Sequence, residues 1–246
     1  MIQIKFLIKM KKKNILIFGA NGSIGSSICK RLMTDFNIIA IVRNTENILN
    51  DNAKNLSIIK WDVLNEKNIP DELLETKVNA ICWSQGINFN DSIKDFTIDK
   101  HIEMYKVNCL FILKSLNLLI KNNLLTNSAK MCVISSIWQN IARQDKMSYS
   151  ISKSAIVGIV NSLAVDLAEK NCLINAILPG VTETNMTHKN LSKSQIDNVK
   201  QATNFNRLSN INDIGNLVYY LCSDANTSIT GQFINIDLGY SNVRVI

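Results

Sequence analysis

The sequence predicts a single-domain α/β fold, a doubly wound, seven-stranded parallel sheet with helices on both faces. Short apolar runs alternate with longer segments of helical periodicity from Asn14 to Ala225. The short runs are apolar throughout, which is typical of strands that are buried on both faces of a parallel sheet. The chain of 246 residues has the length of one large domain, and its two prolines and nine glycines leave little room for a linker.

Seven apolar runs are the predicted strands. In chain order they are Ile15–Phe18, Ile38–Val42, Leu56–Ile59, Val78–Trp83, Met131–Ser135, Leu173–Leu178 and Phe233–Ile236. Helical spacing of apolar residues predicts helices over Ile24–Met33, Ile98–Leu119 and Ser150–Ala168. The predicted packed face of the last helix comprises Ile151, Ala155, Gly158, Ile159, Leu163 and Leu167. Residues 1–12 are expected to be a poorly ordered leader, followed by the domain over residues 13–246.

The composition is that of an ordinary globular protein, with 46% hydrophobic and 19% charged residues. Its net charge of +7 suits an anionic cofactor or substrate. The one dense basic run, residues 9–13, precedes the first strand, and no aromatic residues alternate with the other cations, so we expect no nucleic-acid partner. Six cysteines without a CxxC pair and only two histidines predict no metal site, and reduced thiols favour a cytoplasmic protein. No apolar run has the length of a membrane span, so no membrane partner is expected.

The first predicted strand ends in a candidate phosphate-binding turn. The segment Gly19-Ala20-Asn21-Gly22-Ser23-Ile24-Gly25 runs directly into a helix. Without side chains, a pyrophosphate can approach the backbone N–H groups at the positive end of that helix. Glycines also suit any tight turn, but their position after the first strand of an alternating chain favours a dinucleotide. The predicted cofactor contacts are Gly19, Asn21, Gly22, Ser23, Ile24 and Gly25.

The end of the second predicted strand indicates which dinucleotide binds. An acid there would accept a hydrogen bond from the ribose 2′-OH of NAD and would repel the 2′-phosphate of NADP. This chain has Val42 followed by Arg43, whose planar guanidinium matches a phosphate, so NADP(H) is favoured over NAD(H). A plain surface arginine is the alternative. Asp62 and Val63, after the third strand, are predicted to meet the adenine, and a helix N-cap at Asp62 is the alternative.

Tyr149 and Lys153 lie four residues apart and therefore share one face of a predicted helix. A free tyrosine has a pKa of about 10 and is a poor proton donor or acceptor at neutral pH. A nearby ammonium favours the phenolate and lowers that pKa toward the useful range. Ser136 follows the fifth predicted strand, and open parallel sheets bind ligands at this edge. The combination predicts an acid–base site, although each residue by itself is unremarkable.

Together these motifs resemble the short-chain dehydrogenase/reductase family over roughly Lys13 to Tyr240. The family's Tyr-x-x-x-Lys motif falls on Tyr149 and Lys153, its catalytic serine on Ser136, and its assisting asparagine on Asn108. The resemblance implies a Rossmann-type fold and an NADP(H)-dependent oxidoreductase that interconverts a carbonyl and a secondary alcohol. It also implies a role for each residue. Tyr149 would protonate the carbonyl oxygen, Lys153 would lower the tyrosine pKa and bind ribose, Ser136 would stabilise the oxyanion, and Asn108 would hold a water.

The resemblance adds further cofactor contacts, which are Gly86, Lys153, Pro179, Gly180 and Thr184. The chain also departs from the family pattern. Phe18 replaces the usual threonine before the first glycine, and Ser23 replaces the usual middle glycine. The segment Trp83-Ser84-Gln85-Gly86 lacks the family's asparagines, and Ile137-Trp138-Gln139 follows the serine where a glycine is usual.

The segment from Met186 to Leu208 is expected to cover the substrate, and Trp138, Met186 and Phe205 are the predicted substrate contacts. A packed position in the core is the alternative for Trp138. The length of this segment resembles that of 3-oxoacyl-carrier-protein reductases, so a β-keto thioester is the first expectation. Lys130 and Lys170 are candidates for docking an acidic carrier, or are simply solvated charges. A ketone of a sugar or sugar nucleotide is the second expectation, because the segment is polar.

A catalytically silent, cofactor-binding regulator is the alternative of another class. The resemblance further implies a homo-oligomer, a dimer or a tetramer, formed through two long helices and the last strand. In this chain the two helical segments are residues 98–120 and 149–170. Packing within one subunit also explains their apolar content.

Overall fold

The computed structural model describes residues 12–44, 53–203 and 205–243. All seven predicted strands are present and form one parallel sheet in the order β3-β2-β1-β4-β5-β6-β7. Their bounds are β1 Lys13–Phe18, β2 Phe36–Val42, β3 Leu56–Lys60, β4 Val78–Trp83, β5 Leu125–Ile134, β6 Leu173–Pro179 and β7 Phe233–Ile236. Because β1 lies between β2 and β4, the strand order reverses beside β1, where parallel sheets of this type form a ligand crevice.

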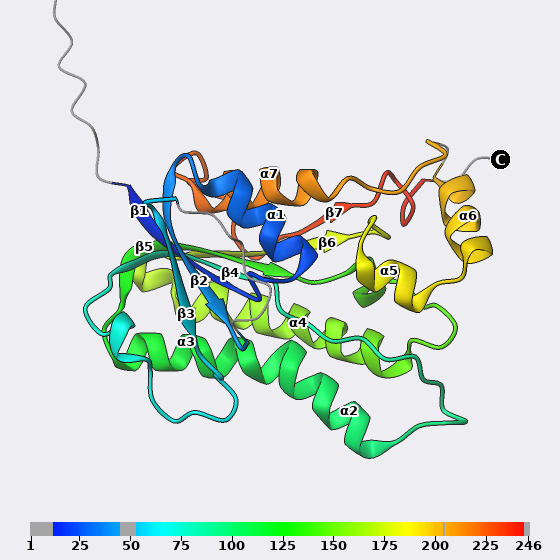
Figure 1. Cartoon of the computed structure of the whole chain (residues 1–246), viewed down its shortest axis with the longest axis horizontal. Helices are drawn as coiled ribbons and strands as arrows, with labels where there is room; N and C mark the ends of the chain where they lie inside the picture. Colours follow the sequence, from blue (N-terminus) through cyan, green and yellow to red (C-terminus); the bar gives the residue numbers. More distant parts are fainter. Residues whose placement is uncertain (1–11, 45–52, 204, 244–246) are drawn as a thin grey trace, which may run out of the picture.

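Helices cover both faces of the sheet (Figure 1). One face carries α1 (Ser23–Leu32) and α7 (Ile211–Cys222), and the other carries α2 (Ile98–Tyr105), α3 (Phe111–Lys121) and α4 (Met147–Asp166). Two short helices, α5 (Asn185–Asn190) and α6 (Lys193–Ala202), follow β6 near the carboxyl ends of the strands. The predicted doubly wound, single-domain fold is confirmed.

The last four residues of the central strand β1, Ile15–Phe18, show why the strands consist mainly of apolar residues. Ile15 and Ile17 belong to the core beneath α1 and α7, whereas Leu16 and Phe18 belong to the core beneath α3 and α4. All four side chains are fully buried. Since successive residues of a strand point to opposite faces, a strand covered on both faces needs apolar residues at every position.

The packed face predicted for α4 is partly wrong. Ile151 and Gly158 are exposed, whereas Ile156 and Val160 are fully buried. Apolar residues surround this helix on all sides, so their spacing alone did not identify the side that faces the sheet.

The predicted continuous helix over Ile98–Leu119 is interrupted. Between α2 and α3, residues Lys106–Leu110 form a π-helical turn that contains the buried Asn108. Such turns widen a helix locally and often occur at functional sites. The side-chain contacts of Asn108, described below, account for the interruption.

The predicted leader, residues 1–12, lies outside the described residues except for Lys12, whose ammonium donates to the Met33 carbonyl at 3.2 Å. Among the helices that the structure describes, none combines the length and hydropathy needed to cross a membrane. In the same described ranges, no three histidine, cysteine or acidic residues gather in an arrangement that would hold a metal ion.

Candidate active site

The turn between β1 and α1 leaves no room for side chains at two of its glycines. Gly19 has a φ of +73°, in the left-handed region, and a Cβ built on it would lie 2.7 Å from the Gln85 backbone nitrogen. A Cβ on Gly25 would lie 2.2 Å from the Gly19 carbonyl oxygen. The helix begins at Ser23 with no acidic residue in its first turn, so the positive end of its dipole is not neutralised there.

A cavity of about 490 Å³ opens above this turn, at the carboxyl ends of β1, β2 and β4. Nine of the predicted cofactor residues line it, namely Gly19, Asn21, Gly22, Ser23, Ile24, Arg43, Asp62, Gly86 and Thr184. Gly25 lies behind this wall, where its missing side chain lets α1 approach the turn. Val63 is fully buried in the core and its side chain does not line the cavity.

Asp62 lines the same cavity and does not begin a helix. Its carboxylate accepts a hydrogen bond from the Asn65 side chain at 2.8 Å, and residues 63–65 form a turn. The N-cap alternative is therefore wrong, and the carboxylate remains at the cavity wall.

Ser136 and Tyr149 meet in a second, smaller cavity of about 120 Å³. Ser136 directly follows β5, and its Oγ accepts a hydrogen bond from the Trp138 backbone N–H at 3.3 Å. Tyr149 lies in the first turn of α4, and its hydroxyl forms a hydrogen bond with the Ser136 side chain. Ile24, Thr184 and Met186 line both cavities, so the tyrosine lies next to the larger one.

Burial shifts the pKa values of Tyr149 and Lys153. It raises the pKa of Tyr149 to about 12, although the hydrogen bond from Ser136 acts in the opposite direction. Burial also lowers the pKa of Lys153 to about 8, while the nearby Cys109 raises it. The Lys153 ammonium donates to the Ile134 carbonyl at 3.0 Å and lies 5.7 Å from the centre of the Tyr149 ring. The pKa of Tyr149 therefore lies above its ordinary value rather than below it, because burial outweighs the hydrogen bond from Ser136.

Asn108 connects α4, which carries Tyr149 and Lys153, to the wall of the larger cavity. Its Oδ1 accepts from the Ile87 N–H at 3.0 Å, and its Nδ2 donates to the Ile87 carbonyl at 3.1 Å and to Ser152 Oγ at 2.9 Å. A Cβ on Gly86 would lie 3.2 Å from Asn108 Oδ1 and 3.8 Å from the Lys153 nitrogen. Both amide N–H bonds are thus used by the protein, and Asn108 fixes the loop after β4 against α4.

The predicted substrate residues are only partly brought together. Trp138 is 9% exposed and lines the small cavity with Pro179 and Gly180, and Met186 lines it as well. Phe205 is 59% exposed and lines neither cavity, because it follows α6, beyond the segment that reaches the site.

A family model described as Enoyl-(Acyl carrier protein) reductase matches residues 19–241. The chain belongs to the short-chain dehydrogenase/reductase family. As a member, it is an oxidoreductase of the NAD(P)-dependent type that acts on CH–OH groups.

Known members resemble this dehydrogenase/reductase over almost its full length. The 3-oxoacyl-[acyl-carrier-protein] reductase FabG of Buchnera aphidicola subsp. Baizongia pistaciae is 29% identical, and the match covers 94% of this chain and 98% of that protein. FabG of Aquifex aeolicus is 27% identical with the same coverage. A solved short chain dehydrogenase family protein from Francisella tularensis subsp. tularensis SCHU S4 superposes with a TM-score of 0.84 at 25% identity, over 94% of this chain and 99% of that one. The structure titled ElxO with NADP Bound has a TM-score of 0.81 at 22% identity, over 94% and 99% of the two chains.

The small cavity of this dehydrogenase/reductase contains polar residues that the sequence motifs did not identify. Arg143 and Lys146 line it, together with Asn88. Lys146 is 2% exposed, and its ammonium donates to the amide oxygens of Asn88, at 2.7 Å, and Asn90. Asn88 and Asn90 follow β4, so their place after the carboxyl end of a strand was the available signal. No sequence signal marked Arg143.

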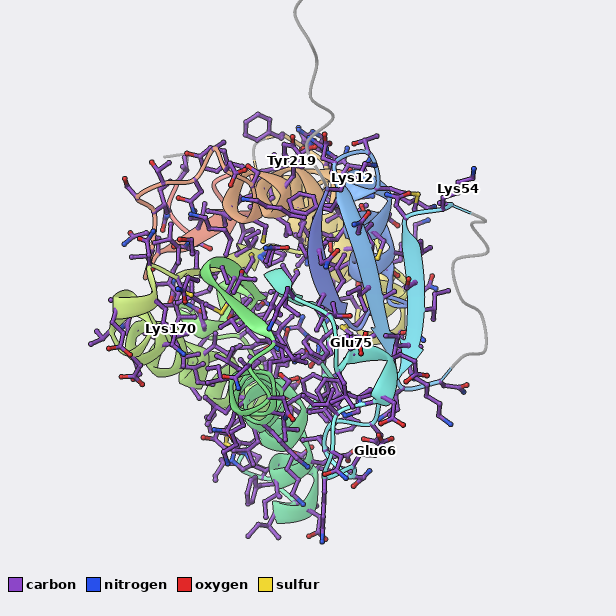
Figure 2. The ribbon with its side chains drawn as sticks, turned by 90° about the vertical axis from the view of Figure 1, so that its left-hand side faces the viewer. Lys12, Lys54, Glu66, Glu75, Lys170 and Tyr219 are labelled. Carbon is purple, nitrogen blue, oxygen red and sulfur yellow. The ribbon has the colours of Figure 1, made fainter. Side chains whose placement is uncertain are left out.

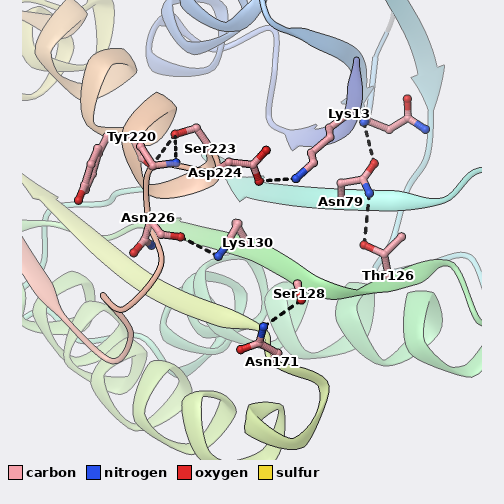
Figure 3. Close-up of polar contacts among 12 residues, drawn as sticks. Lys13, Asn79, Thr126, Ser128, Lys130, Asn171, Tyr220, Ser223, Asp224 and Asn226 are labelled. Carbon is pink, nitrogen blue, oxygen red and sulfur yellow. Dashed lines mark hydrogen bonds and ion pairs between the residues drawn. The ribbon is translucent and has the colours of Figure 1, made fainter. Parts of the chain in front are cut away.

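The two lysines suggested for carrier docking lie near the amino ends of the strands, opposite the two cavities. Lys130 donates to the Asn226 carbonyl at 2.7 Å, in the region where Asn171 binds Ser128 (Figure 3). Lys170 lies on the same face as Lys12, which precedes β1 (Figure 2). This is the face of the amino ends of the strands, whereas both cavities lie at the carboxyl ends. A carrier bound at these lysines would face away from Tyr149.

Proposed function

We propose that this enzyme uses NADP(H) to interconvert a carbonyl and a secondary alcohol, with a 3-oxoacyl thioester as the first substrate class. The observation that carries the proposal is the hydrogen-bonded pair of Ser136 and Tyr149 in a cavity that shares three wall residues with the larger, glycine-walled one. A proton donor next to a nucleotide-sized cavity is the arrangement that this chemistry needs.

The residues of the larger cavity fit a dinucleotide. Gly19 and Gly25 keep side chains away from the start of α1, where a pyrophosphate would bind, and Arg43 stands at the end of β2 for a 2′-phosphate. When bound, the nicotinamide supplies the hydride. ElxO, whose structure carries NADP, has the same fold, which supports the choice of nucleotide.

The catalytic residues divide the remaining work. Ser136 donates its hydrogen bond to the carbonyl oxygen and holds it beside the Tyr149 hydroxyl. Tyr149 transfers its proton to that oxygen as negative charge develops there. The Lys153 ammonium then stabilises the resulting phenolate, which is otherwise disfavoured by burial. Asn108 holds Gly86 and Ile87 in place, so that the wall of the nucleotide cavity keeps its position relative to Lys153.

The relatives named as 3-oxoacyl-[acyl-carrier-protein] reductases support a thioester as the first substrate. A carrier would approach at the carboxyl edge of the sheet, where the cavity opens, rather than at Lys130 and Lys170. Sugar ketones are the second candidate, supported by the polar side chains of Asn88, Thr187 and Asn190 in the small cavity. A catalytically silent regulator is less well supported, because Ser136 and Tyr149 are already hydrogen-bonded. All six cysteines are free and buried, which supports a reducing, cytoplasmic setting.

Fluorescence titration with NADPH and NADH tests the proposal directly. NADPH is expected to bind more tightly, and Arg43→Ala is expected to weaken NADPH roughly 10- to 100-fold while leaving NADH unchanged, because one charge-assisted contact to the phosphate is lost. Lys60→Gln is the control, since it removes a cation from the end of the neighbouring strand β3 without altering the cavity wall. If neither nucleotide binds, the proposed function is wrong. Turnover of acetoacetyl thioesters and keto-sugars then distinguishes the two substrate classes.

We also propose that the enzyme is a homo-oligomer, a dimer or a tetramer. Several apolar side chains along α2, the π-helical turn, α3 and α4 are exposed in the single chain, including Ile98, Leu110, Leu113, Ile151 and Val165. A second copy that packs against this side would remove them from water. Light scattering in solution is expected to give two or four times the chain mass of 27.6 kDa. A single-chain mass across the micromolar range would contradict the proposal.

A further inference from the structure

We propose that the substrate carries an anionic group, a carboxylate or a phosphate, which Arg143 and Lys146 bind inside the small cavity. This inference rests on the proposed carbonyl chemistry, but it favours a substrate with an anionic group near the carbonyl over the neutral thioester named first above. It makes the two cations the residues that select the substrate, beside the Ser136–Tyr149 pair that performs the proton transfer.

The charged side chains that line the small cavity are all positive. Arg143 and Lys146 both line it, and no aspartate or glutamate is present among the described residues of its wall. Asp91, whose charge acts on Lys146, is buried and already engaged, because its two oxygens accept from the N–H and the hydroxyl of Ser148. The cavity therefore offers positive charge that the protein does not pair inside it.

Lys146 is an ammonium held in place without an ion pair. It is 2% exposed, and two of its three N–H bonds go to the amide oxygens of Asn88 and Asn90, which carry no charge. Burial and, to a lesser extent, the charge of Arg143 lower the pKa of Lys146 to about 8, while Asp91 and Asp145 act in the opposite direction. A buried cation in this position is stabilised by a bound anion, and one N–H bond remains to donate to it.

Arg143 presents the second half of the site. Its guanidinium carbon lies 5.9 Å from the centre of the Trp138 ring, and its Nε donates to the Gln144 carbonyl at 3.3 Å. With the described residues, its two Nη groups form no hydrogen bond. The planar fork matches a carboxylate or a phosphate, and the aromatic ring restricts its orientation.

The two cations lie close to the reacting group. The Lys146 nitrogen is 5.8 Å from the centre of the Tyr149 ring, nearly the same distance as the Lys153 nitrogen at 5.7 Å. An anion held by Lys146 therefore lies near the carbonyl that Tyr149 protonates. In a volume of about 120 Å³, such a substrate is a short keto acid or a keto compound with a nearby phosphate.

The test compares three substrates of the same keto group with NADPH as reductant. They are acetoacetate, its neutral N-acetylcysteamine thioester, and acetonylphosphonate, in which a phosphonate replaces the carboxylate of acetoacetate. Wild type is expected to prefer at least one anionic form, and Arg143→Gln is expected to lower the ratio of kcat/KM for that form to kcat/KM for the neutral thioester roughly 10- to 100-fold. Preference for acetoacetate identifies a carboxylate, and preference for acetonylphosphonate identifies a phosphate. Preference for the neutral thioester, unaffected by Arg143→Gln, would overturn the proposal.

Arg207→Gln is the matched control. Arg207 also lies over an aromatic ring, 5.8 Å from the centre of Phe205, but lines neither cavity. The same loss of charge at Arg207 is expected to leave kcat/KM unchanged for all three substrates. An equal effect of both substitutions would mean that net charge, rather than the site, selects the anion, and would contradict the assignment.

A binding measurement separates this inference from the proposed function. Calorimetric titration with malonate and with inorganic phosphate requires no turnover. Binding of either anion that Arg143→Gln weakens and Arg207→Gln does not supports the site, even if no carbonyl is reduced. No binding of either anion, with NADPH binding intact, overturns the anion site and leaves the proposed function standing.

Discussion

Replacing Tyr149 with phenylalanine is expected to lower kcat for carbonyl reduction about 10²- to 10⁴-fold, the usual range for loss of a positioned acid or base. The substitution removes the hydroxyl that is hydrogen-bonded to Ser136 and that supplies the proton in the proposed reaction. NADPH affinity is expected to stay unchanged, because Tyr149 lines the small cavity and not the large one. The decay of NADPH absorbance with a carbonyl that the wild type reduces measures kcat, and its dependence on NADPH concentration shows whether NADPH affinity has changed.

Tyr105→Phe is the control for this experiment. Tyr105 ends α2 and is 38% exposed, so the same hydroxyl is removed outside both cavities. Its turnover is expected to match the wild type. If Tyr149→Phe also keeps its turnover, the assignment of Tyr149 as the acid is wrong. A loss of NADPH binding together with turnover would instead indicate that the ring positions the nucleotide cavity.

The strands could be predicted because burial on both faces of the sheet is visible in the apolar composition of each strand by itself. β1, β2 and β4 are buried on both faces beyond their first one or two residues, so the rest of each strand is apolar, and the glycines that follow β1 mark the turn. The π-helical turn at Lys106–Leu110 was not predictable in the same way, because Asn108 acquires its partners from Ile87 and Ser152, which lie far along the chain. Helical periodicity carries no information about such contacts.

The catalytic residues were found by resemblance to a motif, and their environment was not. Spacing placed Tyr149 beside Lys153, but only the fold shows that both groups are buried enough for desolvation to dominate their pKa values. Arg143 and Lys146 follow no motif. They enter the site because the turn after β5 and the first turn of α4 fold over the carboxyl ends of the strands, which is a tertiary arrangement.

Gly25→Ala is expected to destabilise the enzyme by about 1–3 kcal/mol, as overpacking usually does, and to abolish tight NADPH binding. The added Cβ would lie 2.2 Å from the Gly19 carbonyl oxygen and 2.8 Å from the Ala20 Cα, both backbone atoms. Relief of this overlap requires α1 to move away from β1, which opens the turn that receives the pyrophosphate. Thermal unfolding should shift downward by roughly 2–4 °C per kcal/mol for a chain of this size, and fluorescence titration measures the nucleotide.

Gly158→Ala provides the matched control, because a Cβ at that position in α4 has no atom within 4 Å. The same substitution is expected to leave NADPH binding unchanged and to stabilise the helix by about 0.5–1 kcal/mol. If Gly25→Ala binds NADPH as the wild type does, the close contact between α1 and the turn is not what shapes the phosphate site. If both variants lose stability equally, the effect belongs to alanine in a helix and not to the turn. The expected contrast, loss at Gly25 and gain at Gly158, ties the nucleotide site to the space that one missing side chain leaves.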